Sequence, residues 1–235
     1  MIPLRDVQRT RGVPLIVIAL IGVNIAVYLH QLFLGAGQEA FVYHYALVPA
    51  KFWDISTYAR NGIIGGLLPL ATSLFLHGSP AHVGVNMLYL WIFGDNVEER
   101  LGTVRFLVFY SIAGMAAGLA QVLVSPGSEV PTVGASGAIS GVLAAYWLLF
   151  PAARIVTWIP ILLIVVVEVP AFVFVGFWFI IQILSGMRSL GSPEMAGGVA
   201  WFAHLGGFAA GILLVRVFDK GRSQRGRSDS SEDRA

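Results

Sequence analysis

Residues 134–145 read GASGAISGVLAA and lie in a segment, Val130 to Ala153, that carries no formal charge. A membrane-spanning helix needs roughly 20 mostly apolar residues, and this segment is long enough to hold one. Ser136 is therefore a nucleophile-type side chain at membrane depth. A polar group in hydrocarbon costs several kcal/mol unless it is paired or wetted. Its position indicates a functional role.

A second charge-free segment, Met195 to Val215, contains His204. A hydroxyl and an imidazole are the groups that nucleophilic catalysis pairs as nucleophile and general base. An enzyme site built from Ser136 and His204 is therefore the first hypothesis.

The composition is that of a polytopic membrane protein. Of 235 residues, 57% are hydrophobic and only 12% are charged, whereas soluble domains carry roughly twice that share of charge. Cysteine is absent, which excludes disulfides and thiolate metal sites. The basic residues gather mainly in the two tails, which indicates membrane topology rather than nucleic-acid binding.

Proline, glycine and charged clusters divide the chain into six predicted spans, so the expected fold class is an all-α six-helix membrane bundle. The spans are placed at about 13–34, 79–94, 104–124, 136–150, 169–186 and 199–218. Ser79 and Pro80 resemble an N-cap and first helical position of the second span, and Asp95, Glu98, Glu99 and Arg100 are expected to mark its aqueous end. Residues 35–69 are interpreted as an interfacial loop with short amphipathic pieces, and residues 155–167 as an interfacial or short buried segment.

These spans predict a tail at residues 1–12, a helical domain at 13–218 and a disordered tail at 219–235. With six spans, twelve Lys and Arg residues fall on the side that carries both termini, against Lys51, Arg60 and Arg188 on the other. The positive-inside rule then predicts a cell-membrane protein with both termini in the cytoplasm. Ser136 and His204 would both lie toward the outer face.

Small residues recur on the segments that hold the serine and the histidine. Gly137 and Gly141 lie four apart, and Gly207 and Gly211 share a helical face with His204. Small-xxx-small faces let membrane helices approach closely, so contact between these faces would bring the two polar side chains within hydrogen-bond reach. The alternative is that the glycines serve helix packing alone and the serine bonds a backbone carbonyl.

His77, His82 and Asn86 form a third group at the start of the second span. His82 and Asn86 are four apart and share a helical face, whereas His77 precedes the helix. Imidazole and carboxamide donors can stabilise an oxyanion, together with backbone N–H groups near Ser136. A zinc site made by His77, His82 and His204 is the alternative, but the His77–His82 spacing is not that of two ligands on one helical face, and no intramembrane Asp or Glu is placed to complete it.

Taken together, GASG at 134–137, His77, His82 and Asn86 before it, and AHLGG at 203–207 with Gly211 after it, resemble the rhomboid intramembrane serine proteases. FGDNVE at 93–98 is similar to the family motif that ends the second helix. The resemblance runs from about Val13 to Phe218. It departs from the family in the first loop, where the Trp-Arg pair of many members is not evident.

The resemblance implies six helices around a water-filled cavity and a Ser136–His204 dyad without an acidic member. It implies an oxyanion hole formed by His82, Asn86 and the backbone of Ser136 and Gly137, with His77 and Gly134 in supporting positions. The expected activity is endopeptidase cleavage of transmembrane segments in other membrane proteins, with no metal and no cofactor. A catalytically inactive relative that binds client helices is the alternative, and a small transporter or channel is a second.

Other polar residues at membrane depth have less specific interpretations. Glu168 is expected near the inner end as an interfacial carboxylate, far from Ser136. Trp178 and Gln182 either line a substrate gate or, as we favour, serve as a packing aromatic and as a polar group bonded to a neighbouring helix. His30 and His44 lie in or beside the first loop and need no functional explanation.

Overall fold

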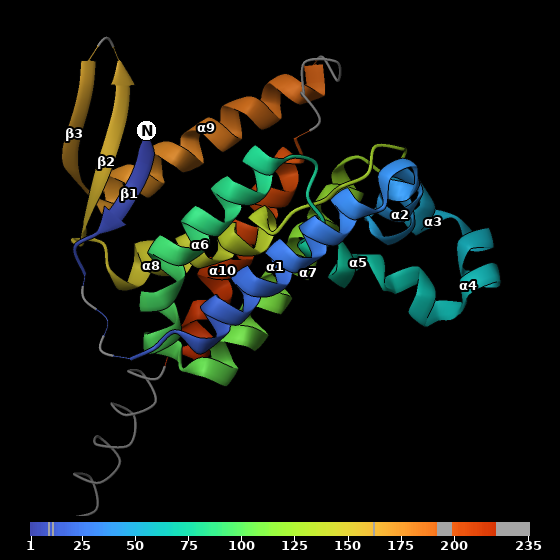
Figure 1. The fold of residues 1–235 in the computed structure, drawn as a ribbon, viewed down its shortest axis with the longest axis horizontal. Helices are drawn as coiled ribbons and strands as arrows, with labels where there is room; N and C mark the ends of the chain where they lie inside the picture. The colour runs from blue at the N-terminus through green and yellow to red at the C-terminus, as the bar shows by residue number, and fades with distance from the viewer. Residues whose placement is uncertain (9, 11, 162, 192–198, 220–235) are drawn as a thin grey trace, which may run out of the picture.

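The computed structural model describes residues 1–8, 10, 12–161, 163–191 and 199–219 and is mostly helical (Figure 1). The six longest helices are α1 (Leu15–Phe33), α6 (Pro80–Leu101), α7 (Thr103–Val124), α8 (Ser136–Leu149), α9 (Ala171–Gly191) and α10 (Trp201–Phe218). Each coincides with a predicted span to within a few residues, except that α6 runs two turns further. The predicted disordered tail at 219–235 lies, apart from Asp219, outside the described residues.

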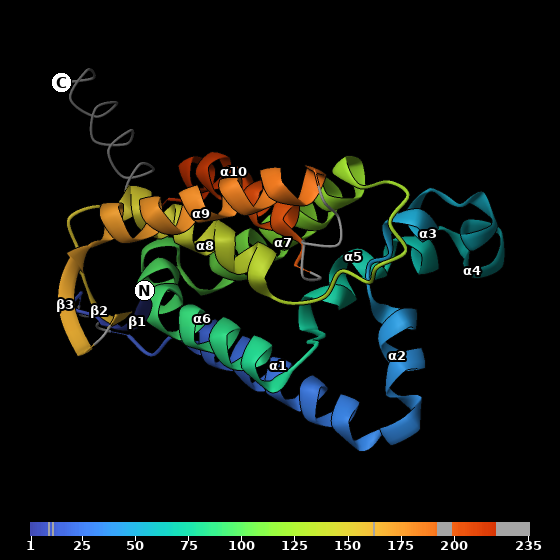
Figure 2. The same cartoon turned by 90° about the horizontal axis from the view of Figure 1, so that it is seen from above.

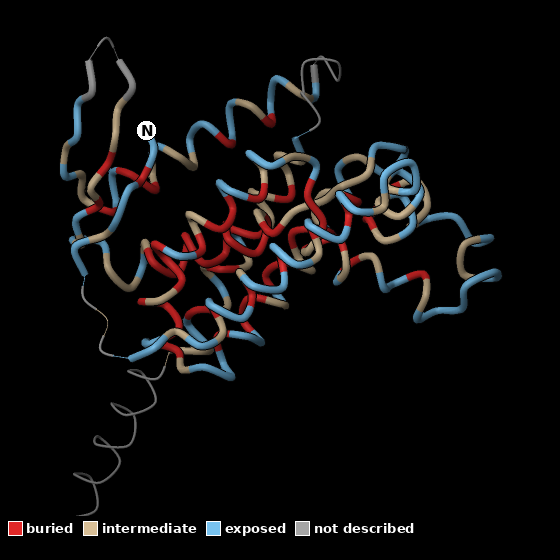
Figure 3. Tube along the Cα trace, viewed as in Figure 1, coloured by how far each residue is buried: buried red, intermediate tan, exposed pale blue. Residues whose placement is uncertain are grey.

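Helix α8 forms the centre of the bundle. Every residue from Gly137 to Tyr146 is buried, and the buried part of the trace in Figure 3 is concentrated in this region. A helix that is apolar on all sides is stable only when other helices surround it. The helix that begins with Ser136 is therefore held on every side by its neighbours.

The glycine faces of α8 and α10 meet, as the sequence predicts. A Cβ atom added to Gly207 would collide with the carbonyl oxygen of Gly137, and one added to Gly211 would collide with that of Gly141. The two backbones are therefore in direct contact. Close approach of this kind is what small residues allow between membrane helices.

Four of the described helices are long and apolar enough to cross a membrane, namely α1, α7, α9 and α10. Helix α8 is apolar but has only 14 residues, and α6 has 22 residues that include charged ones. A helical membrane protein is therefore confirmed, while the count of six spans remains a prediction.

The start of α1, the end of α6 and the end of α10 lie together, and we call this end of the bundle the terminal end (Figure 1). Glu98 accepts hydrogen bonds from the backbone N–H groups of Ile16, at 3.0 Å, and Val17, at 2.9 Å. Arg100 forms an ion pair with Asp219 at 2.7 Å. Both described ends of the chain are therefore on one side of the bundle.

Glu98 corrects the prediction for the end of the second span. The sequence placed it in an aqueous cluster, but its exposed fraction is 3% and α6 continues to Leu101. The carboxylate is buried because it caps α1, whose N-cap residue Pro14 offers no side-chain acceptor. Helix N-termini leave backbone donors unsatisfied and favour a negative charge.

A three-stranded antiparallel sheet departs from the all-α prediction. Its order is β1 (Ile2–Asp6), β2 (Arg154–Ile161) and β3 (Leu163–Pro170), and Figure 2 shows it at the terminal end of the bundle. Arg154 pairs with Glu168 at 3.6 Å at the base of the β2–β3 hairpin. The segment is rich in β-branched residues, which favour strands, but an uninterrupted apolar run does not distinguish a strand from a buried helix.

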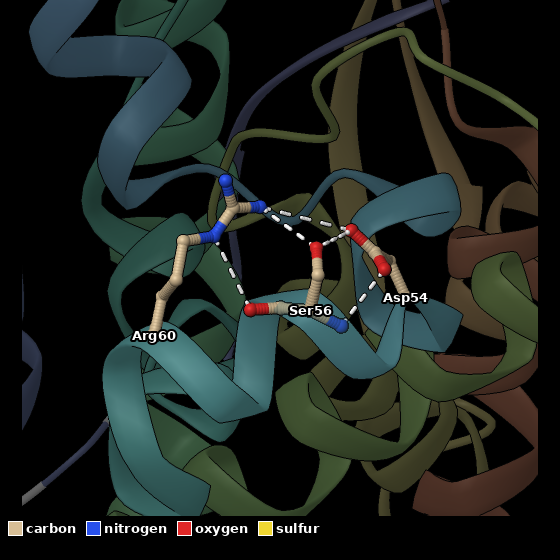
Figure 4. Close-up of polar contacts among 3 residues, drawn as sticks. All are labelled: Asp54, Ser56 and Arg60. Carbon is tan, nitrogen blue, oxygen red and sulfur yellow. Dashed lines mark hydrogen bonds and ion pairs between the residues drawn. The ribbon is translucent and has the colours of Figure 1, made fainter.

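The segment between α1 and α6 consists of short helices beside the bundle, in line with the predicted loop of amphipathic pieces. They are α2 (Gln38–Tyr45), α3 (Pro49–Trp53), α4 (Ile55–Leu67) and α5 (Pro69–Thr72), with short 3-10 turns at Gly35–Gly37 and Ser73–Phe75. Asp54 caps α4 by accepting a hydrogen bond from the Ser56 N–H at 2.9 Å, and Arg60 donates to the Ser56 hydroxyl at 2.8 Å (Figure 4). These contacts fix the loop locally and lie apart from the serine.

Candidate active site

Ser136 is the first residue of α8. The helix makes its first internal hydrogen bond from the Ile139 N–H to the Ala135 carbonyl, at 3.0 Å. The N–H groups of the first turn, including those of Ser136 and Gly137, therefore have no acceptor within the helix. The Ser136 carbonyl accepts a hydrogen bond from the Ser140 hydroxyl at 2.7 Å.

His204 lies in the first turns of α10 and faces the serine. Its Nε2 atom is 2.8 Å from the Ser136 Oγ atom. The contact between α8 and α10 through glycine backbones makes this distance possible, because larger residues there would separate the two helices. The geometry is that of a hydroxyl paired with an imidazole base.

The other ring nitrogen of His204 also has a partner. Its Nδ1 atom is 2.8 Å from Oε1 of Gln182 on α9, and Gln182 Nε2 donates to the Trp178 carbonyl at 3.2 Å. Because an amide oxygen only accepts hydrogen bonds, Nδ1 carries the proton and Nε2 is left to accept one from the serine. The prediction that Gln182 bonds to a neighbouring helix is confirmed.

Two tryptophan rings enclose the imidazole. The ring centroids of Trp178 and Trp201 are 6.1 Å and 6.0 Å from that of His204, and Trp201 meets it edge-on, at 88°. Sequence reasoning treated Trp178 as a packing residue and did not single out Trp201. Its signal was present, since Trp201 is three residues before His204 and therefore shares its helical face.

His82 and Asn86 lie on one face of α6, and both line the cavity that contains Ser136. The Ser79 hydroxyl caps α6 by accepting the N–H of His82 at 3.1 Å, as the sequence predicts. The Gly78 N–H lies 3.4 Å from Nδ1 of His82, which leaves Nε2 of that ring as the donor. Asn86 is 5% exposed, and its Nδ2 atom is buried without a hydrogen-bond partner among the residues that the structure describes. A buried donor without a partner is costly in a folded protein unless a ligand or water accepts from it.

Gly134 is required for this arrangement. Its φ angle is +118°, a conformation that side chains disfavour, and a Cβ atom there would lie 2.7 Å from Nε2 of His82. The Gly134 N–H is held by the Ser73 carbonyl at 2.9 Å. Glycine therefore lets the loop before Ser136 pass directly against the His82 ring.

A cavity of about 730 Å³ joins these groups. Its walls include the polar side chains of Ser136, His204, His82, Asn86 and Gln182, with Ser79 and Thr132 also among the lining residues, and most of the remaining wall is aromatic and aliphatic. Mostly apolar walls with a few convergent polar groups are typical of a substrate site. The cavity is large enough for several residues of a peptide chain.

His77 lies behind the cavity wall. It is 1% exposed, and its ring meets that of His82 at 5.0 Å, with the planes 73° apart. Its backbone forms a reciprocal pair of hydrogen bonds with the Gln31 side chain, each 3.1 Å long. His77 therefore packs against the candidate donor and does not face Ser136.

The remaining sequence candidates lie away from the serine. Within the described part of the chain, no group of three or more His, Asp or Glu residues could hold a metal ion, and both ring nitrogens of His204 are already engaged. Glu168 is paired with Arg154 on the sheet, consistent with an interfacial carboxylate. His30 and His44 contact the aromatic rings of Phe41 and Tyr45 in the first loop.

Comparison with known proteins gives one family. The family model described as the Rhomboid domain matches residues 65–220. Rhomboid protein 1, mitochondrial, of Saccharomyces cerevisiae is 30% identical over 219 residues, which are 89% of this chain and 56% of that protein. The human presenilin-associated rhomboid-like protein, mitochondrial, is 32% identical over 152 residues, 63% of this chain and 37% of that protein. Rhomboid protease GluP of Bacillus subtilis is 43% identical over 76 residues, 32% of this chain and 14% of that protein.

The matched part covers little more than half the length of the yeast relative and less than half the length of the other two. Two of them are mitochondrial proteins by name, and this finding contradicts the predicted cell membrane. The cell-membrane prediction is therefore wrong. Its physical basis was the count of Lys and Arg, which reports the side of a bilayer on which the basic segments lie and not which bilayer it is.

Proposed function

The chain belongs to the rhomboid family of membrane proteins, and from this premise we propose that it is an intramembrane serine endopeptidase. Its substrates would be transmembrane segments of other membrane proteins. The observation that carries the proposal is the 2.8 Å contact between Ser136 Oγ and His204 Nε2, both of which line one cavity.

In the first step Ser136 attacks the scissile carbonyl carbon. Its hydroxyl proton passes to Nε2 of His204, the C–O bond to the serine forms, and the carbonyl becomes a tetrahedral oxyanion. The Nδ1 proton held against Gln182 supports this role, because it leaves the Nε2 lone pair free. The serine is then activated without a buried carboxylate.

The oxyanion would be held by donors that converge from two helices. They are the side chains of His82 and Asn86 on α6 and the backbone N–H groups of Ser136 and Gly137 at the N-terminus of α8. The buried Nδ2 atom of Asn86, which has no hydrogen-bond partner in the described part of the chain, supports this assignment. Donors fixed in advance stabilise developing charge strongly in a site from which bulk water is excluded.

The reaction then completes by acid catalysis and hydrolysis. The imidazolium of His204 protonates the amine of the leaving peptide as the C–N bond breaks, which leaves an ester on Ser136. A water molecule in the cavity, deprotonated by His204, attacks the carbonyl carbon of this ester. The bond between that carbon and Ser136 Oγ then breaks, the peptide leaves with a new carboxyl end, and the serine recovers its proton from His204. These steps need no metal and no organic cofactor.

The same proposal includes the membrane arrangement. Helices α6 and α8 would join the four candidate membrane-spanning helices, giving six spans, with residues 13–218 as the protease domain. Because α8 has only 14 residues, the serine at its first position would lie below the membrane surface. Water would reach it through the cavity rather than through lipid.

The test uses Ser136→Ala and His204→Ala in purified protein reconstituted with a helical reporter substrate. Each variant is expected to lower kcat by at least about 10⁴-fold, because a dyad acts as a unit. Gly176→Ala on α9 is the matched control, since a Cβ atom there meets nothing within 4 Å.

A fluorophosphonate probe provides a second readout. Only an activated serine reacts with it, so the wild-type protein should be labelled at Ser136 and neither variant should be. Wild-type protein that neither cleaves nor labels would favour the inactive relative that binds client helices. Cleavage that survives Ser136→Ala would show that another group is the nucleophile.

A further inference from the structure

Gln182 makes two hydrogen bonds that fix its amide in one orientation. Its side chain is 5% exposed, and Nε2 donates to the Trp178 carbonyl one turn earlier in α9. The opposite orientation would direct Nε2 at His204 and two carbonyl oxygens at each other. Oε1 is therefore the atom that faces Nδ1 of His204, at 2.8 Å.

This contact controls which nitrogen of His204 carries the proton. A neutral imidazole exists as two tautomers, and only the form protonated at Nδ1 can accept the Ser136 proton at Nε2. With no acceptor at Nδ1, the ring would also populate the form protonated at Nε2, which donates to the serine and does not activate it. The amide oxygen favours the reactive form.

The same contact strengthens during the reaction. When His204 takes the serine proton, its Nδ1–H donates from a cation, and hydrogen bonds from charged donors are roughly twice as strong as neutral ones. Gln182 therefore stabilises the charged state more than the resting state. This is differential stabilisation of the transition state.

We propose that Gln182 is the third residue of the site, a positioning residue that orients His204 and selects its tautomer. This inference rests on the proposed function, because it assigns a role within that reaction. It adds that the orienting group is a neutral amide supplied by α9, where many serine enzymes use a carboxylate. A neutral group suits this depth, because an unpaired buried carboxylate carries a large desolvation penalty.

The experiment separates hydrogen-bond acceptance from side-chain shape. Gln182→Met keeps the length and volume of the side chain but removes the acceptor, whereas Gln182→Glu keeps an acceptor at the same position. Ser189→Ala, also on α9, is the matched control, because its hydroxyl bonds only the Gly186 carbonyl in its own helix among the described contacts. Each protein is assayed for kcat, for KM and for the rate of fluorophosphonate labelling at Ser136.

Gln182→Met should lower kcat and the labelling rate together by about 10- to 100-fold with KM unchanged, as expected for loss of one charge-assisted hydrogen bond from the transition state. Gln182→Glu should recover most of both rates at neutral pH or above, and Ser189→Ala should match the wild type. Thermal unfolding in detergent verifies that each variant is folded.

The outcomes distinguish this inference from the proposed function. If the wild type labels and cleaves but Gln182→Met does so at the same rate, the positioning role is wrong and the dyad stands. If Gln182→Glu is as slow as Gln182→Met, the acceptor is not what matters, and the positioning role is again wrong. If the wild type neither labels nor cleaves, the proposed function itself fails.

Discussion

Removal of the Glu98 carboxylate tests how the terminal end of the bundle is held together. Its two oxygens accept the N–H groups of Ile16 and Val17, which are among the unsatisfied donors of the first turn of α1. The substitution Glu98→Gln preserves size and shape. It replaces one accepting oxygen with an NH₂ group that faces a backbone donor.

The expected loss of stability follows from these contacts. One buried N–H is left without an acceptor, which costs about 1–3 kcal/mol. Loss of the negative charge at the N-terminus of α1 adds about 0.3–1 kcal/mol, and more where the pair is buried. Glu98 is 3% exposed, so solvent does not replace the bond. We expect Glu98→Gln to lower the free energy of unfolding by about 2–4 kcal/mol.

The measurement is equilibrium unfolding in mixed micelles, with hydrogen exchange at the amides of Ile16 and Val17 as a local readout. Glu129→Gln, the same chemical change at an exposed carboxyl between α7 and α8, is the control and should stay within about 0.5 kcal/mol of the wild type. A Glu98→Gln variant as stable as this control, with both amides still protected, would refute the capping argument.

Two further predictions concern packing and pH. Gly211→Ala should separate α10 from α8, because its Cβ atom would collide with the Gly141 carbonyl, and so reduce both stability and Ser136 labelling, whereas Gly176→Ala should do neither. Burial raises the pKa of Asp6 to about 6, against the hydrogen bond from Tyr146 that lowers it. The folded state therefore binds this proton more tightly than the unfolded state, and stability should fall by about 1 kcal/mol as the pH rises from about 4 to about 6, after a discount for partial exposure. Denaturation curves measured across this pH range should show no such fall in stability for Asp6→Asn. If the stability of the wild type, but not of Asp6→Asn, instead rose with pH, the predicted direction would be wrong.

Local rules predicted much of the fold. Apolar length placed six helices, the Ser79–Pro80 pair marked the start of α6, and the glycine spacing predicted that α8 and α10 would pack face to face. These signals are readable from sequence because each depends on residues within a few turns of one another. The catalytic roles of Ser136 and His204 came from residue chemistry and family resemblance, and they remain predictions.

The β2–β3 hairpin shows where local rules failed. Its apolar run has neither helical nor strand periodicity. A strand buried on both faces and a helix inserted in a membrane would both show such an uninterrupted run, so the sequence does not distinguish them. β2 and β3 pair with each other within residues 154–170, whereas the third strand of the sheet, β1, contributes Asp6, which is 148 residues before Arg154 in the chain (154 − 6). No short window of sequence contains the pairing between β1 and β2.

By itself, the sequence determined a helical membrane protein with a hydroxyl and an imidazole at comparable depth, because composition, span length and helical period act along the chain. Only the tertiary structure decided that Gln182 would accept from His204 and that Glu98 would cap a helix about 80 residues away. Hydrogen-bond partners in a membrane bundle are chosen by which helices pack together and at what height. Helix packing therefore brings together residues that lie far apart in the sequence.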